Sequence, residues 1–279
     1  MPSAEEFVKK FSEVSPFPRV VAQLTNLIND AGSTMKQFED VIQMDPVLVV
    51  RVLKLVNSSA FSLMQQVDSI GRAIAFLGIR NLHNLAVTES LHGMFGEDSK
   101  SGSNFSRKQL WLHSATTALT SKLVAERIFG QKGDEAYLCA ILHDIGIIVE
   151  AQVSPNEFYH ICEECSEEAS FTELEQKVFK TDHRETGYLI TKQWNMPPEV
   201  PETILAHHNY KDKIAPNSLV GIVQISEYLV AQLGYTMLAN GKPHISPYLT
   251  SHIQENMDEY EVLLEDLPEE LEIIQQMYP

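Results

Sequence analysis

Apolar residues recur every three or four positions along most of this chain, and strand-like alternation of apolar and polar residues is nearly absent. The stretch that begins at Val20, for example, places Val21, Leu24 and Ile28 on one face of a helix. The pattern therefore predicts an all-α fold. Helices are expected over residues 20–29, 35–43, 46–57, 70–77, 79–92, 106–130, 137–149 (with Asp134 as the cap), 155–168, 172–179, 185–194, 198–208 and 219–234, and in the tail from 258.

Two of these helices are apolar on almost every side. The helix that begins at Pro46 is rich in Val and Leu all the way round, so we expect it to be buried. The helix over 137–149 is equally apolar, except that His143 and Asp144 interrupt it. Two adjacent polar side chains inside such a helix demand a separate explanation.

The segment 96–105 is the one clear break in composition, because it is rich in Gly, Ser and charged residues. It predicts a loop or linker between an N-terminal helical part, residues 1–95, and a second helical domain, residues 106–235. Residues 236–279 are expected to form a C-terminal loop followed by an acidic amphipathic helix.

Charge and hydropathy exclude several classes of partner. The 279 residues include 38 acidic and 21 basic side chains, which gives a formal net charge of −17. Nucleic-acid binding depends on Lys and Arg neutralising phosphates, so direct contact with DNA or RNA is not expected. The apolar runs are interrupted before the length that a membrane span needs, and the charged N-terminus does not resemble a signal peptide. We therefore expect a cytoplasmic protein without membrane contact.

The three cysteines are too few and too scattered for a disulfide framework. Cys162 and Cys165 have CxxC spacing, but the chain lacks the second pair that a structural zinc site requires. We interpret them as ordinary helical thiols.

Histidines supply the candidate chemistry. Burying His143 and Asp144 in an apolar helix costs several kcal/mol unless each side chain finds a partner. A divalent metal ion is one such partner, and a mutually hydrogen-bonded pair at a helix junction is the other. Four more histidines lie at or near predicted helix ends, where a core or capping role is the simpler interpretation of each one alone: His113, His183, His207 and His208.

The order of these residues resembles the HD superfamily of metal-dependent phosphohydrolases, and the whole chain more closely resembles the HDOD (HD-related output domain) family. The resemblance covers about residues 14–234 and rests on a series of short motifs. These are Pro16-Phe17-Pro18, Asp45-Pro46, Lys54-Leu55-Val56-Asn57-Ser58, Ala73-Ile74, Leu77-Gly78, Trp111-Leu112-His113-Ser114, Leu142-His143-Asp144-Ile145-Gly146, residues 179–187 and His207-His208.

The resemblance implies an HD-type helical domain, preceded by an N-terminal helical subdomain, with a pocket for one or two divalent ions such as Fe, Mn or Zn. Asp144 would bridge two metals. The superfamily's last ligand, an aspartate, corresponds here to the longer carboxylate of Glu227. The implied ligands are His113, His143, Asp144, His183, His207, His208 and Glu227.

Two departures from the related HD-GYP phosphodiesterases weigh against ordinary catalysis. Ile147 stands where those enzymes have a phosphate-binding lysine, and Asn209 follows the double histidine in place of glutamate and a Gly-Tyr-Pro loop. Lys211 and Lys213 could replace part of the lost positive charge.

Three functions remain open from the sequence. The first is a signal-transduction protein that acts through protein contacts or through a nucleotide-like or phosphorylated small ligand. The second is a metal-dependent phosphohydrolase of a nucleotide or cyclic-nucleotide phosphoester, in which Asp144 would act with a metal-bound water. A haem or iron sensor that uses the same histidines is the third.

Overall fold

This computed structural model describes residues 3–15, 18–57, 66–95, 104–166, 169–210, 213–238 and 244–277. Within these ranges the chain is helical, and its one β pairing is an isolated bridge between Phe105 and Leu238, which confirms the predicted all-α class. The helices are α1 (Ala4–Val14), α2 (Arg19–Asn29), α3 (Met35–Gln43), α4 (Pro46–Val56), α5 (Ile70–Leu77), α6 (Ile79–Phe95), α7 (Arg107–Leu123), the π-helical turn η2 (Val124–Ile128), α8 (Asp134–Leu142), α9 (Ile145–Val153), α10 (Pro155–Glu164), α11 (Phe171–Phe179), α12 (His183–Gln193), α13 (Glu199–Ala206), α14 (Leu219–Gln232), α15 (Pro247–Glu255) and α16 (Met257–Met277).

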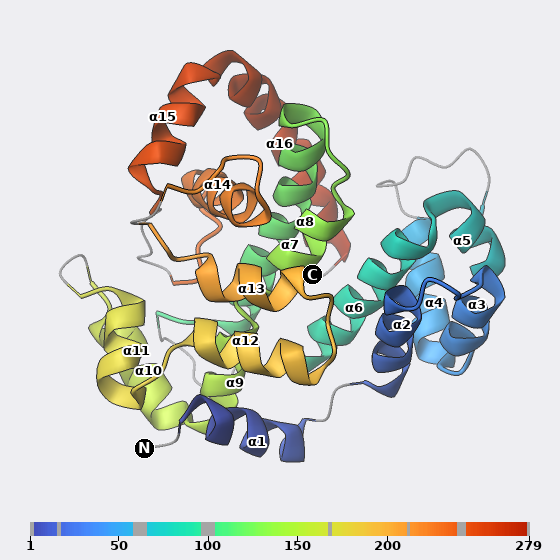
Figure 1. Ribbon diagram of the computed structural model, residues 1–279, viewed down its shortest axis with the longest axis horizontal. Helices are drawn as coiled ribbons and strands as arrows, with labels where there is room; N and C mark the ends of the chain where they lie inside the picture. Colours follow the sequence, from blue (N-terminus) through green and yellow to red (C-terminus); the bar gives the residue numbers. More distant parts are fainter. Residues whose placement is uncertain are drawn as a thin grey trace.

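Helices α2 to α6 form the smaller of two hydrophobic cores, on the right in Figure 1. Its centre consists of side chains from every one of these helices, such as Leu24, Phe38, Val52, Ile74 and Leu82. Helix α6 leads from this group of helices to the rest of the molecule, where its last turns contribute to the larger core.

The larger core is built from α7 to α14, and α16 packs along α7. Helix α1 is not among the predicted helices. It packs against the larger core, below α9 and α12 in Figure 1. Its apolar side chains Phe7, Val8 and Phe11 are buried, and the Phe7 ring meets the ring of Phe179 edge to face. The N-terminal residues therefore help to support the helices that carry His183.

Two further differences from the predicted elements concern helix boundaries. The helix expected over 137–149 is two helices, α8 and α9, which break at His143 and Asp144, and Gly133 rather than Asp134 is the residue that caps α8. The segment expected as a C-terminal loop contains α15, which begins with an N-cap at Ser246 and Pro247 in its first turn. Of the linker expected over 96–105, residues 96–103 lie outside the described part of the chain, while Phe105 packs against Phe158.

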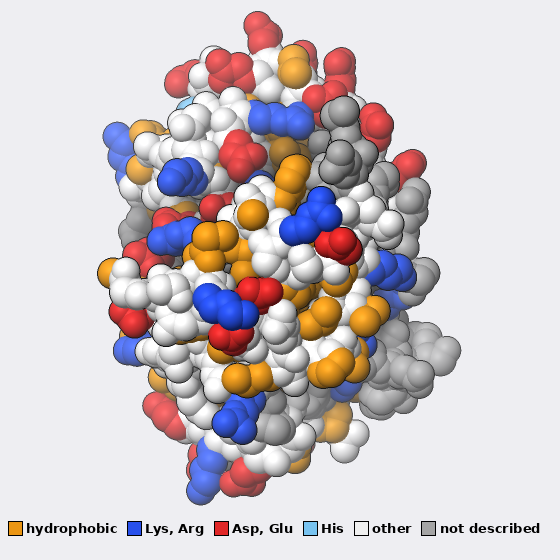
Figure 2. All heavy atoms as spheres, turned by 90° about the vertical axis from the view of Figure 1, so that its right-hand side faces the viewer, with side chains coloured by type: hydrophobic (Ala, Val, Ile, Leu, Met, Phe, Trp, Pro, Cys, Tyr) orange, Lys and Arg blue, Asp and Glu red, His pale blue; other side chains and the backbone are white. Residues whose placement is uncertain are grey.

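The expectation that α4 is buried is wrong for one of its faces. Leu48, Val52 and Val56 do enter the smaller core, but Val47 and Val50 are 60% and 66% exposed. Helix α4 is apolar on nearly all sides, but only one of its faces is buried. It lies at the edge of a small group of helices, and its neighbours α3, α5 and α6 cover that one face. Figure 2, which faces the right-hand side of Figure 1, shows hydrophobic side chains interspersed among charged ones on that side of the molecule.

The stretch Asp134–Val153 is long and apolar enough to cross a membrane by length and composition, although the sequence led us to expect no such segment. Inside the protein 83% of the tested window is buried, and core helices of soluble proteins pass the same test. The chain also breaks in the middle of this stretch, at His143 and Asp144.

Helices α9 and α12 approach each other unusually closely at Gly146. A Cβ atom added there would lie 2.0 Å from the backbone oxygen of His183 and 2.7 Å from its carbonyl carbon. Gly187, one turn further along α12, faces Gly146 and Ile204 in the same crowded contact. Only glycine at position 146 therefore allows the start of α12 to lie beside Asp144.

We predict that Gly146→Ala displaces the first turn of α12 and lowers the free energy of unfolding by about 3 kcal/mol or more, the upper range for overpacking. The overlap is with backbone atoms, so no side-chain rotation relieves it. Urea denaturation followed by circular dichroism measures the effect. Gly93→Ala is the matched control: it lies in α6 with nothing within 4 Å of the added Cβ, and it should be neutral or stabilising. Equal stability of Gly146→Ala and the wild type would contradict the packing argument.

A pH dependence follows from His83, which is buried between α2 and α6 and is hydrogen-bonded through Nε2 to Thr25 Oγ1 at 3.0 Å. Burial lowers the pKa of His83 from 6.5 to about 4. The unfolded chain therefore binds a proton that the folded chain refuses, and stability falls as the pH drops from about 6.5 through 4. The full effect amounts to about 3 kcal/mol.

We expect His83→Gln to reduce this acid sensitivity by a comparable amount. Unfolding free energies of both proteins at pH 7.0, 5.5 and 4.5 make the comparison, because the other titrating groups are common to the two chains. Parallel curves for the two proteins would show that His83 is not the responsible group.

Candidate metal centre

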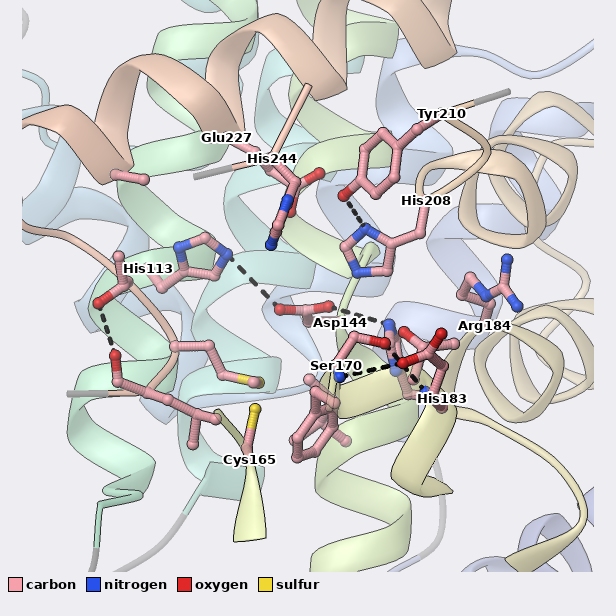
Figure 3. A pocket seen from close by; sticks show the side chains of 18 of the residues that line it. His113, Asp144, Cys165, Ser170, His183, Arg184, His208, Tyr210, Glu227 and His244 are labelled. Carbon is pink, nitrogen blue, oxygen red and sulfur yellow. Dashed lines mark hydrogen bonds and ion pairs between the residues drawn. The ribbon is translucent and has the colours of Figure 1, made fainter. Parts of the chain in front are cut away.

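The structure brings all seven residues that the resemblance singled out into one cluster, at the meeting point of six helices. Figure 3 labels five of them: His113, Asp144, His183, His208 and Glu227. His113 comes from α7, and Glu227 comes from α14. The others sit at helix ends: His143 caps the C-terminus of α8, Asp144 is the N-cap of α9, His183 is the first residue of α12, and His207 caps α13, followed by His208. Helix ends gather side chains from several directions around one point, which a single helix face could not do.

Asp144 lies at the centre of this cluster and turns its two oxygens toward different histidines. Its Oδ2 atom is 3.5 Å from His113 Nε2 and 3.2 Å from His143 Nε2. Its Oδ1 atom is 3.7 Å from His183 Nε2 and 3.7 Å from His207 Nε2. The carboxylate thus separates two groups of imidazoles, one on each oxygen.

All five histidines are held by a bond to Nδ1, which leaves each Nε2 facing the interior of the cluster. The Nδ1 atoms of His143 and His207 donate to carbonyl oxygens three residues back, those of Ala140 and Ile204, which lie in the last turns of α8 and α13. A helix C-terminus leaves such carbonyls without intrahelical partners, so each ring satisfies its own helix end while that bond orients it. The three remaining Nδ1 partners are Tyr235 O for His113, Glu175 Oε2 for His183 and the Tyr210 hydroxyl for His208.

Three polar atoms in the middle of the cluster are buried without a hydrogen-bond partner: Asp144 Oδ1, His183 Nε2 and His207 Nε2. Leaving such atoms unpaired in a protein interior costs about 1–3 kcal/mol each. A divalent cation satisfies imidazole nitrogen and carboxylate oxygen together. The donor set and its unpaired atoms therefore fit a bound metal ion.

Electrostatics distinguishes His143 from its neighbours. Burial lowers the pKa of His113 to about 4, so that ring is neutral and presents a lone pair. Burial also opposes a charge on His143, but Asp144 and Glu227 outweigh it and raise the pKa of His143 to about 9. Burial is likewise overcome at Asp144, where His143 holds the pKa well below its usual range. In the absence of metal, His143 and Asp144 form the hydrogen-bonded pair at a helix junction that was the alternative interpretation of the sequence. A metal ion bound to His143 Nε2 would have to displace the proton on that nitrogen.

Glu227 completes the cluster from the opposite side. Its Oε1 atom is 3.7 Å from His143 Nε2, and it can share an ion position with His143 and His207. The side chain is 14% exposed, whereas His143 is fully buried, so Glu227 borders the solvent-accessible edge of the site. Burial raises the pKa of Glu227 despite the nearby His143 and His207.

The cluster opens into a pocket of about 1060 Å³ (Figure 3). Apolar side chains line one part of it, among them Ile147, Phe171, Leu205 and Met237, and polar groups such as Ser170, Tyr210 and His244 line another. Arg184 is the sole Lys or Arg among the described residues of the lining, and its guanidinium is already bound to Asp182. Ile147, which stands where the HD-GYP enzymes have a phosphate-binding lysine, borders the pocket and brings no positive charge to it.

Several lining residues were not identified from the sequence. Tyr210, whose hydroxyl is bonded to His208, is not among the predicted site residues, although its place two residues after His208 was a usable signal. Cys162 and Cys165 are free thiols as expected, but both border the pocket, and burial raises the pKa of each. Lys211 lies outside the described residues, and Lys213 stacks over the ring of Tyr248 rather than lining the pocket.

Solved structures of similar fold support the architecture. A candidate signal transduction protein from Marinobacter aquaeolei VT8 superposes with a TM-score of 0.76 at 19% identity, covering 98% of this chain and 63% of that one. A candidate phosphohydrolase from Shewanella amazonensis SB2B gives 0.72 at 23% identity, covering 97% and 98%. An HDOD domain protein of unknown function from Geobacter sulfurreducens gives 0.67 at 22% identity, covering 94% and 97%.

Sequence comparison leads to the same group. An uncharacterized protein of Treponema pallidum (strain Nichols) is 25% identical over 212 residues, which are 74% of this chain and 40% of the relative. The chain thus spans less than half the length of that relative and less than two thirds of the Marinobacter protein. The family model of the HDOD domain matches residues 14–210, well over half of the chain. This protein therefore belongs to the HDOD domain family.

Proposed function

We propose that this HDOD protein is a signal-transduction component whose histidine cluster holds one or two divalent metal ions. The observation that carries the proposal is the convergence of five Nε2 atoms, each fixed through Nδ1, around a buried carboxylate with unpaired atoms. A purely structural cluster has no need to aim five Nε2 atoms at one buried carboxylate.

The two faces of Asp144 suggest two ion positions. His113 and His143 would share the first with Asp144, and His183, His207 and His208 would share the second, with Asp144 as the bridging ligand. Glu227 would contribute beside His143 and His207. Imidazole and carboxylate ligands suit Fe, Mn or Zn.

Regulation is favoured over turnover because the pocket offers little positive charge to an anionic substrate. Arg184 is neutralised by Asp182, and Ile147 occupies a wall where a cation would help. The metal ions would then be the main attraction for a nucleotide-like or phosphorylated small ligand. Binding of such a ligand, rather than its hydrolysis, would be the signal.

Output through a protein partner has a candidate surface on α4. Val47, Val50, Arg51 and Lys54 are spaced by three and four residues, so they share one exposed face of this helix. These two cations would attract an acidic signalling protein, whereas the net charge of −17 over the whole chain disfavours nucleic acid as the partner. A cytoplasmic location is part of this proposal.

A metal-dependent phosphohydrolase is the second candidate, favoured by the open pocket directly beside the cluster. A bound divalent ion there would supply Lewis acidity and lower the pKa of water toward neutrality. Asp144 would hold the charge balance of the site, Tyr210 would keep His208 oriented, and Arg184 at the pocket wall would contact an anionic group. Two Shewanella amazonensis proteins of similar fold are described as candidate phosphohydrolases.

The metal proposal is tested by elemental analysis of protein purified without chelators or metal-affinity steps. We expect about one or two Fe, Mn or Zn atoms per chain in the wild type and their loss in Asp144→Ala, since Asp144 faces both groups of imidazoles. Asp258→Ala, which changes an exposed aspartate at the start of α16, is the matched control and should retain the metal. Metal-free wild-type protein, even after incubation with these ions, would contradict the proposal.

Regulation and catalysis are separated by a hydrolysis panel. Metal-loaded protein is incubated with nucleotides, cyclic nucleotides, cyclic dinucleotides and a generic phosphomonoester, and we expect no turnover above that of Asp144→Ala. The same ligands are tested for binding by calorimetry. Turnover that Asp144→Ala abolishes and Asp258→Ala retains would establish the phosphohydrolase instead.

A further inference from the structure

His183 differs from the other four histidines in what holds its ring. Its Nδ1 atom is 2.7 Å from a carboxylate oxygen, Glu175 Oε2, whereas His113, His143 and His207 bond to backbone carbonyls and His208 bonds to a hydroxyl. A carboxyl group differs from these acceptors because it can carry a negative charge, which strengthens the hydrogen bond, whereas a backbone carbonyl or a hydroxyl stays neutral. One position of the cluster is therefore supported differently from the rest.

Glu175 has no role in the pocket itself. It lies on α11, its side chain is fully buried, and it is absent from the residues that line the pocket. Burial raises the pKa of Glu175 well above its usual range, while the neighbouring Glu150 and His183 act in the opposite direction. Among the described residues, the hydrogen bond of its side chain is the one to His183. Its influence on the site must pass through the ring of His183.

A small scaffold holds Glu175 in place behind the ring. Glu150 on α9 lies close enough to Glu175 to affect the pKa of that carboxyl, and it accepts a hydrogen bond from Thr186 Oγ1 on α12 at 3.3 Å. On the same side, Gln176 of α11 donates to Asp182, the N-cap of α12. Three helices are thus tied together around the contact between Glu175 and His183, which fixes the position of the carboxylate as well as that of the ring.

We propose that Glu175 is a positioning residue for one of the two ion positions, the one formed by Asp144, His183, His207 and His208. By accepting a hydrogen bond from Nδ1–H, Glu175 keeps His183 in the tautomer whose Nε2 lone pair faces the ion position beside Asp144 Oδ1. The same bond raises the basicity of Nε2. The inference rests on the proposed metal centre. It adds that the two ion positions are unequal and that this one is tuned from outside the pocket.

The inference has a specific consequence for variants. Glu175→Ala removes the acceptor, whereas Glu175→Gln keeps an acceptor of nearly the same shape without the charge. Loss of an outer partner of this kind lowers metal affinity by about 10–100-fold. We expect this loss in Glu175→Ala at the His183 position, a smaller loss in Glu175→Gln, and no change at the position of His113 and His143. Glu157→Gln, on an exposed carboxylate of α10, is the matched control.

Histidine-labelled protein is titrated with Zn²⁺, and the ¹⁵N ring resonances report each position separately. In wild-type protein the rings of His113 and His183 should both shift at low Zn²⁺. In Glu175→Ala the His183 and His207 resonances should require about 10–100-fold more Zn²⁺, while those of His113 respond as before. Circular dichroism confirms that each variant is folded, and Glu175→Gln provides the conservative rescue if Glu175→Ala is not. Unchanged Zn²⁺ dependence of His183 in folded Glu175→Ala and Glu175→Gln would overturn the inference.

The same spectra without metal keep the inference separate from the metal centre itself. Metal-free wild-type protein should show His183 protonated at Nδ1 alone, and Glu175→Ala should show a mixture of tautomers. Zn²⁺ that shifts no ring in wild-type protein would defeat the metal centre and, with it, the role of Glu175 in binding. An unaltered tautomer in Glu175→Ala would refute the positioning role even if the wild-type protein binds zinc.

Discussion

The structure depends on one constraint, the burial of a carboxylate and an imidazole between two of the most apolar helices of the chain. A single continuous helix through His143 and Asp144 would surround both side chains with apolar neighbours, which cannot serve as their hydrogen-bond partners. The chain instead breaks there, and the two freed helix ends supply part of what the pair requires. Once Asp144 is fixed at the start of α9, its partners must come to it, and they do so from α7, α12, α13 and α14, which end or pass at that point.

Backbone packing and site geometry are consequently the same problem in this fold. The absence of a side chain at Gly146 lets the first turn of α12 approach α9, and that turn begins with His183. Asp182 caps α12 and is itself held by Gln176 and Arg184. The cation that borders the pocket is thereby used to stabilise a helix start, which explains why so little positive charge is left to receive a ligand.

The sequence was informative where a residue's role is local. The Asp182 cap placed His183 in the first turn of α12, and the periodicity of apolar residues gave α3 and α5 their observed bounds. It was misleading where the outcome depends on neighbours. Val47 and Val50 look like core residues, yet both are exposed, and none of the described helices covers them. The pairing of Glu175 with His183 joins two helices, and nothing in the spacing of eight residues indicates that their side chains meet.

In the proposed metal centre, the electrostatic state of the cluster would link metal binding to ligand binding. Without an ion, Asp144 is balanced by a protonated His143, while His183 and His207 keep unpaired nitrogens. An ion that entered would displace the His143 proton, so its affinity would rise with pH, and it would replace one positive charge by two. Because Arg184 is committed to Asp182, the pocket would become attractive to an anionic ligand chiefly with the ion present. Linkage then requires that such a ligand also tightens the ion, so metal supply and ligand supply would be read by this protein as a single combined signal.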